Sequence, residues 1–328
     1  MTSRWMQALA TGLLAVLPPL CAGQTVLNLA SGYPPGSFHV QNLMAFADDV
    51  RQRTGGELQI KVHPGGSLFK AADIRKAVTE GRLDLGEVFG PSLGGVDPVF
   101  SLDALPFLAT GYESALRLWR QVRPLAEKRA TAQGWTLLMS VPWPPQGLFA
   151  AREVRTVSDF KGLAMRENSP PLKKLAEILG ATPVNVESAD LVSALQDGRV
   201  KLVFTSAAQG VDTHIWDNLS WFYQANAWLP RNLLLANKKV LDDLKPAHRT
   251  ALLSAAGAAE ERGWRLSREN AEQSLAALRA AGMKLGQLDG STRARLDRAG
   301  GALTADAMRK ADPELVGVLS TYLAASTR

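Results

Sequence analysis

Hydrophobic and polar positions in the N-terminal half follow a pattern that predicts strands and helices in turn. Residues 25–31 and 57–64 are rich in alternating and β-branched side chains, which indicates half-buried strands. Residues 40–50 carry apolar side chains at helical spacing, and a second helix is expected from residue 72. Residues 83–90 form an apolar third strand. The predicted order is therefore strand, helix, strand, helix, strand.

The same order of elements recurs further along the chain. Strands are expected at residues 162–167, 182–186 and 199–206. Helices are expected at 170–179, where a pair of prolines suits the first turn, and at 189–197. Strands that alternate with helices of this length favour parallel α/β sheets.

A fourteen-residue segment occurs twice, as ADIRKAVTEGRLDL at 72–85 and as ADLVSALQDGRVKL at 189–202, with six identical positions. A unit that recurs once cannot build a solenoid, which needs several stacked copies. It favours two similar lobes, with a ligand in the crevice outside the carboxyl ends of their strands. The two copies diverge where the strands continue into Phe89 and Thr205, and we expect the ligand to be selected there.

Residues 247–281 predict one long helix that begins after Pro246, a residue suited to a first helical turn. At 1.5 Å per residue it would extend about 50 Å, which is enough to cross both lobes. The alternative is a simple packing helix. The residues beyond it are expected to form further short helices.

Residues 1–23 have the pattern of a secretory signal peptide. Arg4 precedes an apolar run at 6–17, which ends at a pair of prolines, and small residues follow Cys21. The run is shorter than the about 20 residues that span a bilayer, and the small residues expected just before a lipidated cysteine are missing. A cleaved signal peptide is thus favoured over a membrane anchor or a lipoprotein, and cleavage would remove the only cysteine.

Charge and motif content bear on the class of function. The formal net charge is +6, and the Lys and Arg residues are interleaved with Asp and Glu. Nucleic-acid binding would need clustered basic residues, whereas a mildly basic exported protein suits a small anionic ligand. The four histidines have no metal-ligand spacing, and no P-loop, zinc-protease or nucleophile-elbow motif occurs. An enzyme is therefore not favoured, and no metal or cofactor is implied.

Six segments carry a resemblance to a known family through their order and spacing, although each is weak alone. They are HPGGSL (63–68), EGRLDLG (80–86), DALPFL (103–108), DFKGLAMR (159–166), LGATPV (179–184) and SALQDG (193–198). The chain resembles the periplasmic solute receptors of TRAP transporters, the DctP-like family, over nearly all of its mature length.

The resemblance implies a two-lobe periplasmic binding protein fold of the α/β class, with a ligand cleft and a long helix that crosses both lobes. We expect lobe I to contain residues 24–143 plus about 232–271, and lobe II residues 144–231 plus about 272–328. The resemblance also implies a periplasmic protein that delivers a small organic anion to the small and large TRAP membrane subunits.

The arginine that ends the corresponding strand binds the substrate carboxylate in that family, and Arg166 occupies this position here. A planar guanidinium makes two parallel charge-assisted hydrogen bonds to a carboxylate. The end of a parallel strand would direct it into the cleft. The alternative interpretation is a salt bridge at the surface or between the lobes.

Three departures from the family pattern bear on the ligand. Gln146 stands where the family often has a second arginine, Thr205 where it has an asparagine, and Phe89 where it has an acidic or polar residue. A site with one arginine and fewer polar partners favours a monocarboxylate with an apolar body over a dicarboxylate or a polyhydroxylated acid.

Tyr33, Trp143 and Asn168 complete the set of candidate ligand-binding residues. Tyr33 lies in the loop that follows the first strand. Core and hinge packing is expected to explain most of the aromatic residues near the predicted cleft, with one or two of them in the pocket. These residues are Trp143, Phe149, Trp216, Trp221 and Trp228.

These features together predict an extracytoplasmic receptor that traps a small organic acid by closure of two lobes. One alternative is a receptor of the same fold that serves a sensor or chemoreceptor. The other is an exported enzyme that acts on an organic acid, which would need a nucleophile or an acid–base pair in the cleft.

Overall fold

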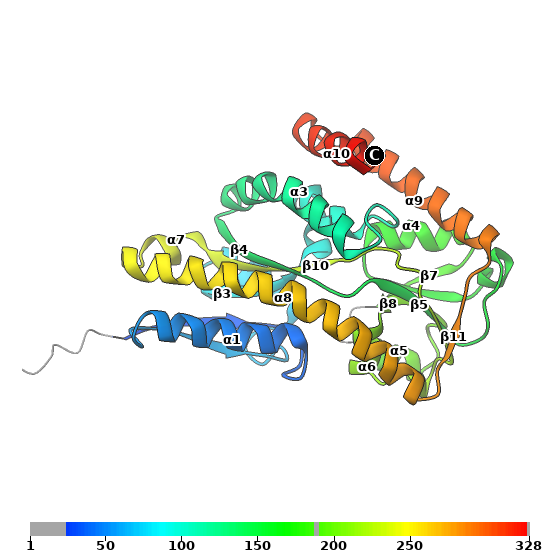
Figure 1. Ribbon diagram of the computed structural model, residues 1–328, viewed down its shortest axis with the longest axis horizontal. Coiled ribbons are helices and arrows are strands. Elements are labelled where there is room, and N and C mark those ends of the chain that lie inside the picture. The colour runs from blue at the N-terminus through cyan, green and yellow to red at the C-terminus, as the bar shows by residue number, and fades with distance from the viewer. Residues whose placement is uncertain (1–23, 187–189, 327–328) are drawn as a thin grey trace, which may run out of the picture.

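The structure is a computed structural model that describes residues 24–186 and 190–326. The predicted signal peptide lies outside the described residues. Two β-sheets form the centres of two lobes, and helices cover both (Figure 1). This two-lobe α/β architecture confirms the predicted fold class. No helix within the described part of the chain is long and apolar enough to cross a membrane.

The first lobe contains a five-stranded sheet with the order β2-β1-β3-β10-β4. Its strands are β1 (Thr25–Ala30), β2 (Leu58–His63), β3 (Leu85–Phe89), β4 (Trp135–Pro142) and β10 (Arg231–Asn237). The three predicted strands pair in parallel, whereas β10 returns from the second lobe and runs antiparallel to β3 and β4. The sheet is therefore mixed.

Helices cover both faces of this sheet. They are α1 (Phe38–Arg53), α2 (Ala71–Thr79), α3 (Tyr112–Ala132) and α7 (Lys238–Asp242), with two 3₁₀ segments, η1 (Gly90–Gly95) and η2 (Pro98–Ala104). Alternate residues of β10 enter different cores. Leu233 and Leu235 pack with α2 and α3, while Leu234 packs with α1. Burial on both faces explains the nearly continuous apolar sequence of this strand.

The second lobe contains a six-stranded sheet with the order β11-β9-β5-β8-β6-β7. Its strands are β5 (Gln146–Ala150), β6 (Ala164–Glu167), β7 (Thr182–Asn185), β8 (Leu202–Ser206), β9 (Trp221–Tyr223) and β11 (Lys284–Gly286). The predicted strands β6, β7 and β8 are parallel, and β5 is antiparallel to its neighbours β8 and β9. Shorter helical elements described between these strands are η3 (Val157–Phe160), α4 (Pro170–Leu179), α5 (Leu191–Gln196), α6 (Ala207–Asp212) and η5 (Ile215–Asp217).

The repeated segment forms the same structure in each lobe. Helix α2 leads through Gly81 into β3, and helix α5 leads through Gly198 into β8. Both glycines have positive φ angles, 70° and 68°, which only glycine adopts at little cost. The predicted helix, glycine stop and buried strand are therefore confirmed in both copies.

Helix α8 (Pro246–Ala280) contains 35 residues and runs along both lobes (Figure 1). It packs on α1 and β4 in the first lobe and on α6 in the second. A Cβ atom at Gly263 would lie 2.5 Å from a methyl group of Val141, so glycine permits the close approach of α8 to β4. The predicted crossing helix is confirmed.

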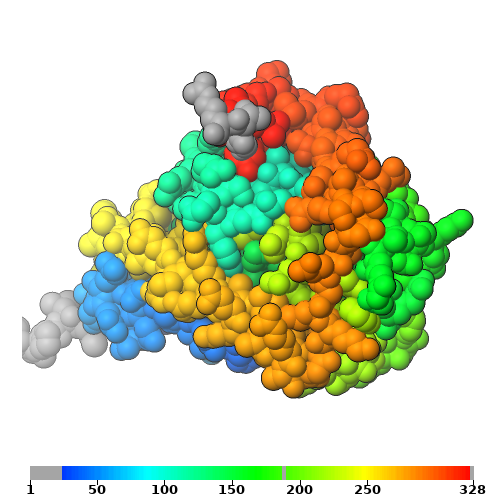
Figure 2. Space-filling view, turned by 45° about the vertical axis from the view of Figure 1, so that its right-hand side comes forward, coloured from blue at the N-terminus to red at the C-terminus, as the bar shows by residue number. Residues whose placement is uncertain are grey.

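The C-terminal residues form two helices, α9 (Gly290–Lys310) and α10 (Pro313–Ser326). Helix α9 contacts α4 in the second lobe, but α10 packs on α3 in the first lobe (Figures 1 and 2). The expected boundary, which places all of 272–328 in lobe II, is therefore wrong for α10. The physical reason is that Leu315, Leu319 and Tyr322 are buried in the first lobe's core.

Candidate functional site

Two chain segments cross between the lobes beside each other, and hydrogen bonds join them. The Trp143 amide donates to the Pro230 carbonyl at 2.8 Å, and the Gln146 amide donates to the Trp228 carbonyl at 2.9 Å. The Ala227 amide in turn donates to the Gln146 carbonyl at 2.9 Å. These bonds fix the positions from which Trp143, Gln146 and Trp228 line a cavity between the lobes.

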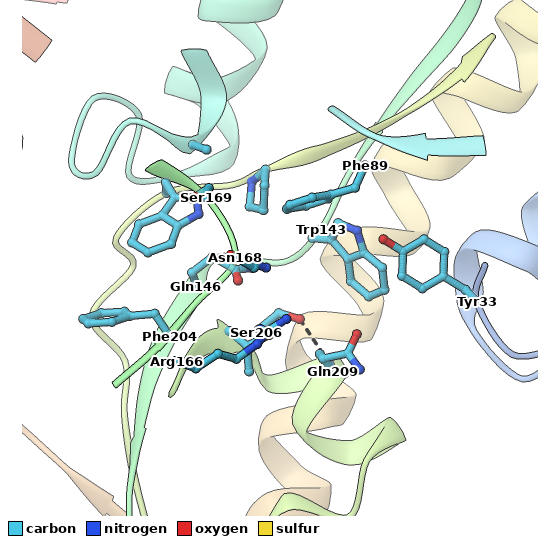
Figure 3. Close-up of a pocket in the computed structure, with 14 residues that line it drawn as sticks. Tyr33, Phe89, Trp143, Gln146, Arg166, Asn168, Ser169, Phe204, Ser206 and Gln209 are labelled. Carbon is cyan, nitrogen blue, oxygen red and sulfur yellow. Dashed lines mark hydrogen bonds between the residues drawn. The ribbon is translucent and has the colours of Figure 1, made fainter. Parts of the chain in front are cut away.

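The cavity encloses about 460 Å³ of space when the open solvent at its mouth is included. All seven candidate residues line it (Figure 3). The first lobe and its crossing segment contribute Tyr33, Phe89 and Trp143, and the second lobe contributes Gln146, Arg166, Asn168 and Thr205. The wall also contains residues that the sequence pattern did not indicate, namely Ala104, Ser169, Phe204, Ser206, Gln209 and Pro230. A ligand-binding role for any of these residues is a prediction.

Arg166 lies near the carboxyl end of β6, and only 2% of its surface is exposed. Its Nε donates to the Val186 carbonyl at 2.9 Å, which fixes the plane of the guanidinium in the cavity wall. A guanidinium has five N–H donors, and pairs of them match the two oxygens of a carboxylate. The position of Arg166 is thus suited to hold an anionic group inside the cavity.

Neutral polar side chains from the second lobe line the same cavity as Arg166. The Gln146 Nε2 atom donates to the Pro144 carbonyl at 2.9 Å, which orients this amide. Thr205 lies on β8 opposite Gly147 of β5 and is buried. Asn168 follows the end of β6 and borders the cavity. Amide and hydroxyl groups of this kind can donate hydrogen bonds to a ligand oxygen.

Aromatic rings form the remaining walls. The Tyr33 and Trp143 ring centroids are 5.1 Å apart, and those of Phe204 and Trp228 are 5.5 Å apart. Among the five aromatic residues near the predicted cleft, Trp143 and Trp228 line the cavity. The other three belong to the cores of the second lobe, as expected for most of the set: Phe149, Trp216 and Trp221.

A buried polar network lies behind the first-lobe wall. Glu87 Oε2 accepts from the Ser31 hydroxyl at 2.5 Å, and Glu87 Oε1 accepts from Asn232 Nδ2 at 2.9 Å. His39 Nδ1 lies 3.3 Å from the same Oε1. Burial raises the pKa of Glu87, but the bonds from His39, Ser31 and Asn232 outweigh it and hold this pKa below its ordinary value. Glu87 is therefore an ionised acceptor at neutral pH.

Asn232 connects this network to the cavity. Its Oδ1 accepts from the Trp143 indole Nε1 at 3.0 Å and from the Tyr33 hydroxyl at 3.3 Å. Burial, followed by the charge of Glu87, raises the pKa of Tyr33 far above its ordinary value, so the phenol keeps its proton. One signal for Glu87 is present in the sequence, since this residue interrupts the short apolar strand β3, whereas Asn232 precedes the apolar run of β10 and does not interrupt it.

A second buried pair anchors the start of β10 next to the cavity. Asp103 Oδ2 accepts from the Arg231 amide at 2.6 Å and from Arg231 Nε at 3.0 Å. The Arg231 guanidinium also lies over the Trp119 ring, 4.4 Å from its centroid. Burial raises the pKa of Asp103, and the Arg231 charge opposes this increase. Ala104 follows Asp103 in the chain, and Pro230 precedes Arg231. The pair therefore fixes the positions of two residues that line the cavity.

The described residues contain no group of three or more His, Cys, Asp and Glu side chains that could hold a metal ion. What the cavity offers is one buried guanidinium, several neutral polar groups and aromatic walls.

A family model described as bacterial extracellular solute-binding protein, family 7 (DctP), matches residues 29–311. Among sequence relatives, the 2,3-diketo-L-gulonate-binding periplasmic protein of Escherichia coli K12 is 25% identical over 79% of this chain and 80% of its own length.

Solved structures of the same type are also similar. DctP6, an extracytoplasmic solute receptor of Bordetella pertussis that binds pyroglutamic acid, has a TM-score of 0.88 and 39% identity. The match covers 91% of this chain and 99% of that one. A TRAP solute-binding protein from a marine metagenome, specific for pyroglutamate, has a TM-score of 0.88 and 32% identity over 92% of this chain and 99% of its own.

Proposed function

Because the chain belongs to family 7 of the bacterial extracellular solute-binding proteins, we propose that its cleft binds a small monocarboxylate, pyroglutamate or a close analogue. The chain is a TRAP-type solute receptor for a small organic acid. Receptors of this type work with membrane subunits, and its homologues include proteins named periplasmic. We expect this chain to be periplasmic and to release its ligand unchanged to the two TRAP membrane subunits.

The buried guanidinium of Arg166 is the observation that carries the proposal. Among the described residues that line the cavity, Arg166 has the only charged side chain. A second carboxylate on the ligand would be buried without a cationic partner from this wall, which is energetically costly. The carboxylate of a monocarboxylate ligand would pair with the Arg166 guanidinium. The neutral remainder of the ligand would pack against the aromatic rings.

Pyroglutamate has the properties that this cavity favours. It is a compact ring with one negative charge, and it carries an amide that can use the neutral polar groups around Arg166. Two proteins that are 39% and 32% identical to this chain over at least 91% of its length bind pyroglutamate. Their ligand supports the same class of ligand here.

A thermal-shift screen followed by calorimetry on the mature chain tests the proposal. The screen compares L-pyroglutamate with L-proline, L-glutamate and succinate. A ligand at about 100 times its Kd raises the free energy of unfolding by ~2.7 kcal/mol, which shifts the melting temperature by several degrees. We expect this shift with pyroglutamate and one binding site per chain. A shift with succinate alone, or with none of these acids, would contradict the proposed ligand.

A further inference from the structure

The amide of Asn232 has only one orientation that satisfies its neighbours. The indole Nε1–H of Trp143 can only donate, so the atom it meets at 3.0 Å must be the Asn232 oxygen. The ionised Glu87 carboxylate can only accept, so the atom 2.9 Å from its Oε1 must be the Asn232 nitrogen. Ser31 and His39 hold this carboxylate from its other sides. The network therefore presents the Asn232 oxygen toward Tyr33.

The orientation of Asn232 determines what Tyr33 can offer to a ligand. The Tyr33 hydroxyl has a single proton, and that proton is donated to Asn232 Oδ1 at 3.3 Å. Tyr33 borders the cavity, with its hydroxyl turned toward Trp143 (Figure 3). Its phenol oxygen retains lone pairs and can only accept a further hydrogen bond. The indole N–H of Trp143 also donates to Asn232, so these two first-lobe aromatic residues both direct their donors at Asn232.

We infer that the Tyr33 oxygen accepts a hydrogen bond from a donor on the ligand. Glu87 and Asn232 act as positioning residues, because they orient the Tyr33 hydroxyl proton away from the ligand. The inference rests on the proposed function and adds a requirement to it. The preferred monocarboxylate must carry an N–H or O–H group that faces the first lobe while its carboxylate lies on Arg166. The lactam N–H of pyroglutamate meets this requirement, whereas the ring oxygen of the corresponding lactone does not.

The second lobe can supply hydrogen-bond donors to oxygen atoms of the ligand. Arg166 can only donate, and the amides of Gln146 and Asn168 and the hydroxyl of Thr205 can each donate as well. A ligand with its carboxylate and carbonyl oxygens toward the second lobe and its N–H toward Tyr33 would match both walls. Such a ligand contacts both lobes, which is the condition for binding to favour a closed form.

A pair of ligands that differ at one atom tests the inference by calorimetry on the wild-type mature chain. L-Pyroglutamate has a ring N–H, and (S)-5-oxotetrahydrofuran-2-carboxylate has a ring oxygen in the same place. The ring oxygen of the lactone would face the Tyr33 oxygen. Both atoms are acceptors, so no hydrogen bond would form between them. We expect the lactone to bind roughly 10- to 100-fold more weakly than the lactam. Equal affinities would overturn the inference and leave the proposed function intact, whereas binding of neither acid would overturn both.

Variants then assign the preference to Tyr33. Tyr33→Phe removes the acceptor, while Asn232 Oδ1 keeps Trp143 as its donor, so we expect the lactam to lose affinity and the preference to fall to a few-fold. Tyr112→Phe is the matched control, because it removes a hydroxyl that bonds to Ser267 at 2.9 Å outside the cavity. The control should keep the wild-type ratio. A Tyr33→Phe chain that retains a wild-type melting temperature and the full preference would overturn the role of Tyr33.

Discussion

Replacement of Arg166 gives the largest effect on ligand affinity that this site predicts. In the alanine variant, a bound carboxylate would be buried in the cavity without its guanidinium partner. Removal of one member of a buried charge pair costs about 3–5 kcal/mol. Since each 1.4 kcal/mol is about a tenfold change in affinity, Arg166→Ala should weaken binding roughly 150- to 4,000-fold.

The lysine variant separates charge from geometry at the same position. Arg166→Lys retains a positive charge but loses the planar pair of donors and the bond from Nε to the Val186 carbonyl. We expect an intermediate loss of roughly 10- to 100-fold, because an ammonium binds a carboxylate as a point charge.

Isothermal titration calorimetry with L-pyroglutamate measures these affinities, and thermal melts without ligand check that each variant folds. Arg265→Ala is the matched control, because the Arg265 side chain is 61% exposed and forms a surface pair with Glu269. Exposed pairs of this kind contribute little, so the control should bind as the wild type does. Affinity within a few-fold of wild type in a folded Arg166→Ala chain would refute the proposed role of this guanidinium.

Three further predictions concern stability. Gly86→Ala should destabilise the chain by about 1–3 kcal/mol, because the new Cβ would lie 2.5 Å from a methyl group of Ile74; urea unfolding with an unchanged midpoint would contradict this. Asp103→Ala should cost about 3–5 kcal/mol, since it leaves the buried Arg231 charge without its carboxylate; a wild-type midpoint would show that the pair is dispensable. The pKa of Glu87 is lower in the folded chain than in the unfolded chain. Its ionised form therefore stabilises the fold above the ordinary glutamate pKa of about 4.3. This contribution is lost as the pH falls through the pKa of Glu87 in the folded chain. The difference in unfolding free energy between wild type and Glu87→Gln should therefore shrink below about pH 4, and a difference that grows with acid would contradict it.

The hydrophobic pattern predicts the elements with the longest periodic signals most accurately. Helix α8 is expected at 247–281 and found at Pro246–Ala280. The predicted parallel strands of both lobes also lie within a few residues of their expected positions. By contrast, β9 and β11 are three residues each and depend on neighbouring strands for their pairing. Local periodicity cannot indicate strands that short.

Tertiary contacts decide the features that the pattern misses. Chain order places α10 with the second lobe, but its apolar side chains fit the core beside α3. The role of Asn232 depends on strand register, because β10 runs antiparallel to β3 and sets Asn232 opposite Phe89. Without β10, the link from Glu87 through Asn232 to Tyr33 cannot be foreseen.

The resemblance to the family indicates four candidate positions that composition alone does not indicate. Arg166, Gln146, Phe89 and Thr205 come from different strands of two sheets, and the structure brings all four to one cavity. The diverging ends of the repeated segment, at Phe89 and Thr205, both reach this wall. The repeat builds the two similar scaffolds, and the residues beyond it differ between the two sides of the cleft.

A crystal structure of the mature chain with L-pyroglutamate tests the central claim most directly. The account predicts one ligand between the lobes, with its carboxylate on the Arg166 guanidinium and its ring nitrogen within hydrogen-bond distance of the Tyr33 oxygen. A carboxylate bound away from Arg166, or a cleft that stays empty at saturating ligand, would contradict it.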